Sequence, residues 1–386
     1  MKKYLEEYCV GCGLCTALGK AECYYDEKGF MHPRNGDSAW LSQVCPSGGR
    51  QQALMEFDKI WGRCKNIYYG WSTDEEVRRH ASSGGVITEV ASWLVENGKV
   101  DGVIHTSTDN CDPTKTVSCI SRSRGEIVSR SGSRYAISHP LELLTKIDTT
   151  KKYAFIGKPC DVAALNNYME VSPDLKQVIV CTISFFCAGV PSKLAQNNLL
   201  EHLGCQKENL KALRYRGDGW PGYTTAVDEM GRPYKTDYAT AWGKILGRDI
   251  MKVCRFCLDG IGETADIACG DAWYLTSDKK PDFSEADGRN VIFSRTERGQ
   301  KILEEIVAAR KIEVEKANLD DLKYIQTYQL ERRATMFDKC AAMKISGRGF
   351  PKYRIANILQ YSRYVSIKKH GATFVGIIKR VVMKKI

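Results

Sequence analysis

The spacing of hydrophobic positions changes near residue 65 of the chain. Residues 1–65 show little periodicity and many turn residues, which is typical of a small domain that folds around a ligand. Further along, short apolar runs alternate with segments that are apolar at helical spacing. The predicted strands are residues 100–106, 153–156 and 178–186, and the predicted helices include residues 86–96, 191–203, 299–309 and 319–332. This alternating order predicts a parallel or mixed sheet covered by helices.

Composition places the chain among folded globular proteins but adds one anomaly. Of 386 residues, 43% are hydrophobic and 27% are charged, whereas 16 are cysteine, far above ordinary usage. A disulfide scaffold is excluded by size, since such scaffolds are small and this chain is long enough to bury its own cores. The first residues, Met1–Tyr8, lack the apolar segment of a signal peptide, and the longest apolar run, Val178–Val190, is too short to span a bilayer. We therefore expect a reducing, cytoplasmic location, where cysteines serve metal or redox chemistry.

The net charge of +11 is concentrated in one segment. From Lys339 to Ile386 there are 12 Lys or Arg and no Asp or Glu, whereas the first 338 residues carry 45 basic and 46 acidic side chains. A neutral body disfavours nucleic-acid binding despite the basic tail. Apolar residues of the tail recur at helical spacing, namely Phe374, Ile377, Ile378, Val381 and Val382. This stripe suits packing against the protein's own body or contact with an anionic membrane surface, so a membrane-peripheral location is an alternative.

Three cysteines near the N-terminus lie at C-x2-C-x2-C spacing, and a Cys-Pro pair follows about 30 residues later. Such short spacers let successive thiolates bind three irons of a [4Fe–4S] cubane, and Gly11 and Gly13 permit the tight backbone that this wrapping needs. The predicted ligands of one [4Fe–4S] cluster are Cys9, Cys12, Cys15 and Cys45. Cys23 is a competing fourth ligand. A zinc knuckle is the alternative, but it normally uses pairs of C-x2-C rather than a triple.

A second cysteine group is predicted from the topology of the sheet. Cys160 and Cys187 each follow directly on a predicted strand, so both belong at the carboxyl edge of the sheet, where α/β proteins bind ligands. Cys254 and Cys257 add a chelating pair on a turn, and four thiolates make a closed site for zinc or a second [4Fe–4S] cluster. The remaining cysteines lack partners at ligand spacing and are interpreted as structural: Cys64, Cys111, Cys119, Cys181, Cys205, Cys269 and Cys340.

A flavin site is the third candidate. Iron–sulfur clusters transfer single electrons, whereas most organic substrates take two, so a flavin commonly stands between them. Its pyrophosphate needs backbone N–H donors at helix starts. Two runs offer such donors, Ser82-Ser83-Gly84-Gly85 and Ser131-Gly132-Ser133-Arg134-Tyr135. Similar runs also occur as plain turns or helix caps, and no G-x-G-x-x-G follows a strand, so the standard Rossmann fingerprint is absent.

These motifs occur together with others in one order along the chain. The others are Val100-Asp101-Gly102-Val103, Ile156-Gly157-Lys158-Pro159-Cys160, Phe186-Cys187, residues 215–222 (YRGDGWPG), residues 254–259 (CRFCLD) and residues 265–273 (ADIACGDAW). In this order, residues 70–309 resemble the β subunit family of coenzyme F420-reducing hydrogenases and dehydrogenases. Similar bacterial chains with an N-terminal ferredoxin-like module are often associated with surface polysaccharide synthesis.

The resemblance implies an iron–sulfur flavoprotein oxidoreductase. FAD is implied at the two serine- and glycine-rich runs and at Gly157 and Lys158, with a [4Fe–4S] cluster on Cys160, Cys187, Cys254 and Cys257. Electrons are expected to pass between the clusters and FAD, and on to a deazaflavin or another small organic substrate. A ferredoxin-like protein is expected as electron donor or acceptor. The fused N-terminal module and the basic tail lie outside the shared core, which leaves the identity of the substrate open.

The expected architecture is of α+β or α/β class. A ferredoxin-like [4Fe–4S] module covers residues 1–65, a mixed-sheet α/β flavin domain covers residues 66–310, and a helical C-terminal region with a basic tail covers residues 311–386. Lys158 is the predicted catalytic residue, because an ammonium group there would stabilise an anionic reduced flavin; the alternative is a solvated turn residue. His105 is interpreted as a surface or satisfied core residue. Two alternative functions stay open, a non-catalytic electron-relay subunit and a zinc-stabilised binding module.

Overall fold

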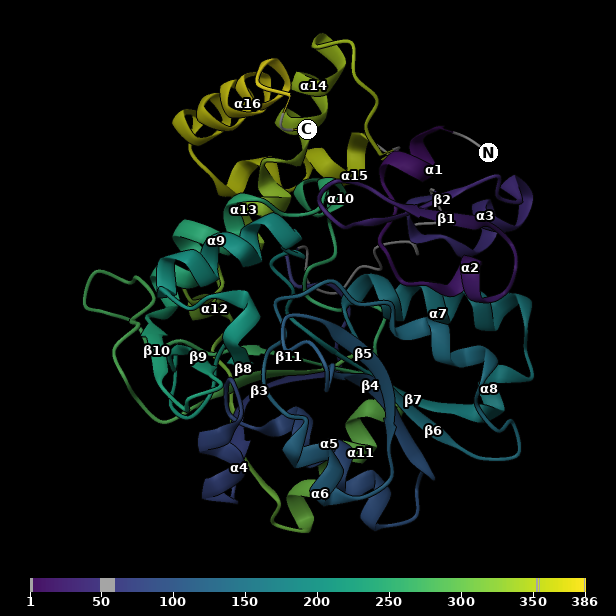
Figure 1. The fold of residues 1–386 in the computed structure, drawn as a ribbon, viewed down its shortest axis with the longest axis vertical. Helices are drawn as coiled ribbons and strands as arrows, with labels where there is room; N and C mark the ends of the chain where they lie inside the picture. The colour runs from purple at the N-terminus through teal and green to yellow at the C-terminus, as the bar shows by residue number, and fades with distance from the viewer. Residues whose placement is uncertain (1–2, 49–59, 352, 354, 385) are drawn as a thin grey trace.

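The computed structural model describes residues 3–48, 60–351, 353, 355–384 and 386, and an eight-stranded mixed sheet lies at its centre (Figure 1). The strand order is β13-β3-β12-β11-β7-β6-β4-β5. The strands are β3 (Asn66–Ser72), β4 (Gly102–Thr108), β5 (Thr116–Ser121), β6 (Tyr153–Gly157), β7 (Ile179–Phe185), β11 (Ile267–Asp271), β12 (Asn290–Ser294) and β13 (Ile312–Lys316). The four central strands β4, β6, β7 and β11 run parallel, and the outer pairs are antiparallel. The predicted mixed α/β sheet is therefore confirmed.

Helices cover both faces of this sheet. They are α4 (Glu75–His80), α5 (Val86–Glu96), α6 (Arg124–Ser129), α7 (Pro159–Val171), α8 (Leu175–Val178), α11 (Glu297–Ala308) and α12 (Leu319–Ile325). Successive side chains of a strand alternate between the two faces. Ala154 and Ile292 therefore join the core under α5 and α11, whereas Phe155 packs with α7 and Phe293 packs with α12. Figure 1 shows α5, α6 and α11 on one side of the sheet and α7 on the other.

A proline starts one helix near the sheet edge, and a break divides the predicted helix 319–332. Helix α7 begins at Pro159, directly after β6, because proline suits the first turn of a helix. Cys160 therefore lies within that first turn. The predicted helix 319–332 is broken at Gln326, so that α13 (Thr327–Ala334) follows α12 as a separate helix.

A three-stranded antiparallel sheet forms a separate layer, drawn on the left of Figure 1. Its strands are β8 (Leu210–Arg214), β9 (Thr224–Asp228) and β10 (Pro233–Thr236). Helix α9 (Lys193–Leu203) covers it with Leu199 and Leu200, which pack on Leu213 and Tyr215. Sequence periodicity did not predict these strands.

The N-terminal region contains short helices and one hairpin. The helices are α1 (Lys3–Glu7), α2 (Leu14–Ala17) and α3 (Ser38–Val44), and the hairpin strands are β1 (Glu22–Tyr25) and β2 (Met31–Arg34). The region packs on α7, where Asn167 Nδ2 donates to the Val44 carbonyl at 3.1 Å. The ferredoxin-like fold of this region stays a prediction, as do the domain boundaries.

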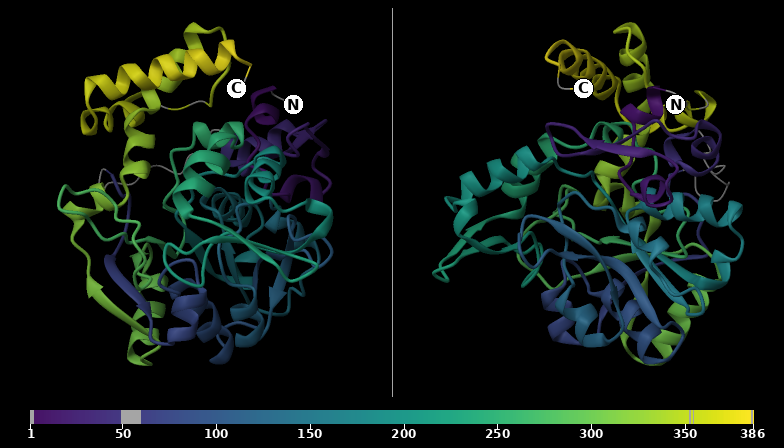
Figure 2. Two further views of the ribbon diagram at one scale, coloured as in Figure 1. Left: turned by 60° about the vertical axis from the view of Figure 1, so that its left-hand side comes forward. Right: turned by 45° about the vertical axis from the view of Figure 1, so that its right-hand side comes forward.

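The C-terminal helices α14 (Met336–Ile345), α15 (Ile355–Leu359) and α16 (Ile367–Val382) lie beside the N-terminal region (Figure 2). The Tyr8 hydroxyl donates to the Gly349 carbonyl at 2.6 Å, and Ile377 is buried against α14 residues. Most of the predicted apolar stripe thus packs on the protein's own body, although Val382 is 76% exposed. No helix among the described residues is long and apolar enough to cross a membrane. Membrane contact by the tail stays a prediction.

Candidate redox site

The first cysteine group lines one apolar pocket. The Cys9, Cys12, Cys15 and Cys45 side chains share its wall with Leu5, Leu41 and Ala164, the last of which belongs to α7. Gly11 and Gly13 adopt the positive φ angles of 69° and 84° that the predicted tight turn requires. The Gly11 amide points at Cys9 Sγ at 3.3 Å. Backbone amides directed at sulfur are what a ligated cluster uses. We call these four residues the outer cysteine group.

Cys23 does not line this pocket, although its thiol is near enough to Cys15 to raise the pKa of that thiol beyond the effect of burial. It is exposed on β1, whereas Cys45 lines the pocket with the other three thiols. Burial and the thiol of Cys45 together raise the pKa of the Cys9 thiol above its ordinary value. Of the two competing fourth ligands, the geometry favours Cys45.

The cysteine loop is clamped to the rest of the protein by a short helical segment, Pro140–Thr145. His139 Nδ1 lies 2.7 Å from the Gly11 carbonyl, and the Leu141 amide donates to the Cys12 carbonyl at 3.1 Å. A Cβ atom on Gly13 would lie 2.7 Å from Glu142 Cγ, so this approach needs glycine. The outer cysteine group is therefore docked on the central domain.

The second cysteine group lies at the carboxyl edge of the sheet. Parallel strands β6 and β7 bring Cys160 and Cys187 to this edge, and α10 (Lys252–Arg255) supplies Cys254, with Cys257 following it. Burial and the thiols of Cys187 and Cys257 raise the pKa of Cys254 to about 12. Burial, Asp161 and the same two thiols raise the pKa of Cys160. The four predicted residues are thus brought together, and we call them the inner cysteine group.

A buried arginine faces the inner cysteine group. Arg332, on α13, is 5% exposed, and its Nη1 donates to the Cys187 carbonyl at 3.1 Å. Its Nε and Nη2 atoms are buried and have no hydrogen-bond partner among the residues that the structure describes. Burial alone would lower the pKa of this guanidinium, but the thiols of Cys257, Cys187 and Cys254 outweigh it and raise the pKa. A buried cation with unused donors calls for an anion.

Both cysteine groups fit a [4Fe–4S] cluster on this evidence. Four thiolates around a cluster make an anionic centre, which suits the unused donors of Arg332 and the amide directed at Cys9. Within the described ranges, no three His, Cys, Asp or Glu side chains converge as ligands of a single metal ion. A cubane differs in this respect, because it distributes its protein ligands over separate irons.

The first turn of α7 lies between the two groups. Cys160 belongs to the inner group, Ala164 lines the outer pocket, and Asp161 raises the pKa of both the Cys12 and the Cys160 thiols. Lys158 Nζ contacts Asp161 Oδ2 at 2.7 Å and donates to Ser138 Oγ at 3.0 Å. Lys158 is 7% exposed, so it is not a solvated turn residue. Burial would lower its pKa, but Asp161 and Cys160 outweigh burial and raise the pKa, which keeps the ammonium charged.

The two predicted flavin runs meet in space. The Ser133 amide donates to Ser82 Oγ at 2.6 Å, and Ser82 in turn donates to the Arg216 carbonyl at 3.4 Å. Ser83 donates to the Arg289 carbonyl, and Gly84 packs too closely on Gly70 for any side chain. Gly85 has a φ of 79° and opens helix α5. The serines are thus joined into one polar surface at the start of α5. Gly157, by contrast, packs against Phe155 at the end of β6.

Two arginines flank the second run. Arg214 Nη2 lies 3.4 Å from the position of a Cβ on Gly132, and Arg134 donates to the backbone carbonyls of Leu213 and Lys115. Burial lowers the pKa of both guanidinium groups, although Arg214 Nε lies 3.2 Å from Asp218 Oδ2. Tyr135 packs on Trp242, with ring centroids 4.7 Å apart. Two arginines, one of them paired with Asp218, together with a helix N-terminus and aromatic faces fit a dinucleotide such as FAD.

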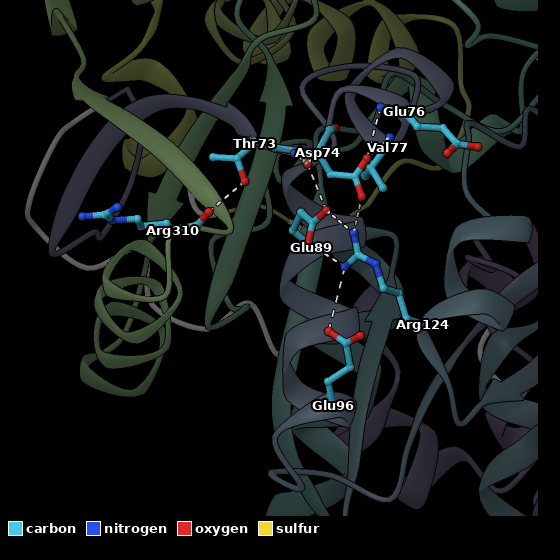
Figure 3. A network of polar contacts seen from close by, with 9 residues as sticks. Thr73, Asp74, Glu76, Val77, Glu89, Glu96, Arg124 and Arg310 are labelled. Atoms are coloured by element: carbon cyan, nitrogen blue, oxygen red, sulfur yellow. Dashed lines mark hydrogen bonds and ion pairs between the residues drawn. The ribbon is translucent and has the colours of Figure 1, made fainter.

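A buried ion-pair network holds the start of α5 in place (Figure 3). Glu89, 1% exposed, accepts two hydrogen bonds from Arg124 at 2.8 and 2.9 Å and one from Ser72 at 2.9 Å. The same Arg124 reaches Asp74, whose carboxylate caps α4. Side chains from β3, α5 and α6 are thereby tied together beside the serine- and glycine-rich run.

Two arginines of the site were not predicted, because they belong to no motif or spacing pattern in the sequence. Arg332 is the last residue of the predicted helix 319–332, which has no cluster motif, and Arg214 precedes the YRGDGWPG motif without a spacing rule of its own. His105 is buried and contacts Ser121 Oγ at 2.7 Å, and burial lowers its pKa to about 4, as expected for a satisfied core residue.

The chain is similar in sequence to proteins of one known family. Residues 67–145 and 150–320 match the N-terminal and C-terminal sequence models of the coenzyme F420 hydrogenase/dehydrogenase beta subunit. The chain is 26% identical to the coenzyme F420 hydrogenase subunit beta of Methanosarcina barkeri, over 71% of this chain and 91% of the relative. It is 26% identical to the coenzyme F420-dependent sulfite reductase of Methanocaldococcus jannaschii, over 84% of this chain and 49% of the relative.

Two further likenesses extend the comparison. The chain is 22% identical to the chloroplastic 7-hydroxymethyl chlorophyll a reductase of Oryza sativa subsp. japonica, over 77% of this chain and 61% of the relative. A chain in the solved structure of the F420-reducing [NiFe] hydrogenase complex from Methanosarcina barkeri has the same fold, with a TM-score of 0.54 and 23% identity, over 73% of this chain and 96% of that one.

The protein is thus a mixed α/β redox protein. It belongs to the coenzyme F420 hydrogenase/dehydrogenase beta subunit family, a family of redox subunits, which confirms the resemblance drawn from its motifs.

Proposed function

We propose that the protein is an iron–sulfur flavoprotein oxidoreductase that exchanges electrons between a ferredoxin-like protein partner and a small organic substrate or a deazaflavin-type coenzyme. The observation that carries this proposal is the placement of two four-cysteine groups on either side of the first turn of α7. Names of relatives that act with coenzyme F420 support a deazaflavin as one candidate substrate. A role of the protein in surface polysaccharide synthesis stays a prediction.

The chain's own residues would bind and orient the cofactors. The outer and inner cysteine groups would each hold a [4Fe–4S] cluster, and FAD would lie at the joined serine- and glycine-rich runs. When bound, the clusters supply one-electron and the flavin two-electron chemistry. Arg214 and Arg134 would face the flavin pyrophosphate, and Tyr135 offers an aromatic surface. Lys158 holds a positive charge beside Asp161, and its predicted contact with the flavin stays a prediction.

The test is cofactor analysis of the full chain purified without oxygen. Released flavin should be FAD, and the visible absorbance of the protein should bleach on stepwise reduction with dithionite. Mixing the reduced protein with oxidised coenzyme F420 should then restore the absorbance if a deazaflavin is the partner. A colourless protein with stoichiometric zinc and no flavin would contradict the proposal and favour the zinc-stabilised binding module.

The flavin site can be tested separately with Arg214→Gln. Removing a charged donor from a phosphate site costs about 1.5–3 kcal/mol, so FAD affinity should fall by at least about tenfold. Arg232→Gln, on the exposed turn between β9 and β10, is the matched control and should bind FAD normally. Equal FAD affinities in the two variants would contradict the proposal that FAD binds at this surface.

A relay subunit without its own substrate is the second candidate. The fold shared with a chain of a multi-subunit hydrogenase complex favours it. In that case the protein should co-purify with redox partners from its native host and be reduced by them, yet show no turnover with coenzyme F420 or other small acceptors.

A further inference from the structure

We infer that Arg332 is a positioning residue for the inner cluster, which sets the reduction potential of that cluster by directing a guanidinium at it. The inference rests on the proposed function, since it requires a cluster on the inner cysteine group. Arg332 lies outside residues 67–145 and 150–320, the two stretches that match the family.

Three features of Arg332 carry the inference. Its side chain is almost fully buried, although the arginine side chain normally seeks water. Its Nε and Nη2 atoms have no partner within the described part of the chain, which is costly unless an acceptor is supplied. Its Nη1 donates to the Cys187 carbonyl at 3.1 Å, which places the guanidinium beside the inner cysteine group.

The surrounding structure holds the guanidinium in this orientation. Nη1 donates to the Cys187 carbonyl, which also accepts from Gln329 Nε2 at 3.2 Å. The Tyr328 hydroxyl donates to the neighbouring Ala188 carbonyl at 3.0 Å, so α13 is fastened along the Cys187 loop. Gly260 leaves room for the side chain, because a Cβ there would overlap Arg332 Nη2.

Two other arginines in this region have acidic partners, whereas Arg255, between Cys254 and Cys257, donates to the Arg248 carbonyl at 2.8 Å. Arg333, the residue after Arg332, pairs with the buried carboxylate of Glu263, and Arg216 pairs with Asp271 at 2.9 Å. Arg332 has no acidic side chain as partner among the described salt bridges. An anionic cluster held by thiolates is the counter-charge that fits, and donors aimed at cluster sulfurs are one of the protein's means of tuning potential.

The sign of the effect follows from charge. Adding an electron makes the cluster more negative, so a nearby guanidinium favours the reduced state and raises the midpoint potential. Removing it should lower the reduction equilibrium constant by about tenfold, which is about 59 mV for a one-electron couple.

The experiment is an electron paramagnetic resonance titration of the anaerobically purified full chain. All proteins carry Cys12→Ala, which leaves the inner group as the only complete four-cysteine set. Arg332→Gln should lower the midpoint potential, and Arg332→Lys should lower it less, because it keeps the charge but loses the planar donor fork. Arg232→Gln, on the remote β9–β10 turn, should leave the potential unchanged.

Gly260→Ala gives an independent variant that keeps Arg332 but displaces its guanidinium, and the potential should move in the same direction as in Arg332→Gln. If Arg332→Gln loses inner iron, the potential is read from Arg332→Lys and Gly260→Ala, and an unshifted potential in both would overturn the inference. Full iron with an unshifted potential in Arg332→Gln would overturn the inference while leaving the proposed function intact. Absence of inner iron in the parent protein would contradict the proposed function itself.

Discussion

The two cysteine groups of this protein are built in opposite ways. The outer group comes from a single stretch, residues 9–45, whose turns and glycines place the thiols locally. The inner group is assembled from the segments that follow two parallel strands, and from helix α10 with the residues after it, about 70 residues further along the chain. Local spacing therefore defines one site and sheet topology defines the other. The loss of each group should consequently have different effects on the fold.

The largest expected effect compares Cys187→Ala with Cys12→Ala. Each variant should lose about half of the iron, because each breaks one of two four-cysteine sets. Cys187→Ala should also lower the free energy of unfolding by about 3 kcal/mol, since Arg332 is left buried without a counter-charge. Cys12→Ala should change the free energy of unfolding of the central domain by only about 1 kcal/mol, because the outer group lies in the small N-terminal region and not in the central sheet. Anaerobic iron assays and urea unfolding measure both quantities. Equal losses of unfolding free energy in the two variants would contradict the expected difference between the two cysteine groups.

The membership of the outer group is tested by Cys45→Ser against Cys23→Ser. Cys45→Ser should remove about half of the iron, because Cys45 lines the pocket of the outer group. Cys23→Ser should retain all of it, since Cys23 is exposed on β1. The reverse pattern in the iron assay would make Cys23 the fourth ligand.

The helical turn between the groups depends on a buried ion pair. Lys158→Met should lower the free energy of unfolding by about 3–5 kcal/mol, because Asp161 is left as an unpaired buried carboxylate. The double variant Lys158→Met/Asp161→Leu should recover much of that loss. Urea unfolding at neutral pH measures all three proteins. A double variant no more stable than Lys158→Met would show that the pair does not account for the cost.

The smallest expected effect concerns the docking of the outer group on α7. Asn167→Ala removes the hydrogen bond to the Val44 carbonyl and should cost about 1–2 kcal/mol locally. Outer iron should then be lost to a chelator about tenfold faster, whereas inner iron should be lost at the parental rate. Chelation followed by absorbance measures both phases. Parallel acceleration of the two phases would mean that the groups are not independently held.

The sequence predicted those parts of the fold and site that depend on local or regular features. Helix α5 after Gly85 and strands β6 and β7 follow from apolar spacing, and Cys160 with Cys187 follows from the parallel arrangement of those strands. The tight turns at Gly11 and Gly13 were expected from the C-x2-C-x2-C spacing.

The rest depends on contacts between distant segments. Strand β13 pairs with β3 across more than 200 residues, and Ser82 meets Ser133 only because of the folded arrangement around α5. Arg332 is buried because α13 packs over the Cys187 loop. The sequence of α13 itself does not predict this packing. Such contacts carry no periodic signal, so a single sequence did not reveal them.

The most direct test of the central claim is the count of iron and acid-labile sulfide in the full chain purified without oxygen. Two [4Fe–4S] clusters predict about eight iron and eight sulfide per chain, and about four of each in both Cys12→Ala and Cys187→Ala. A parent protein with about four iron, or with zinc and no sulfide, would contradict the claim that both cysteine groups hold clusters.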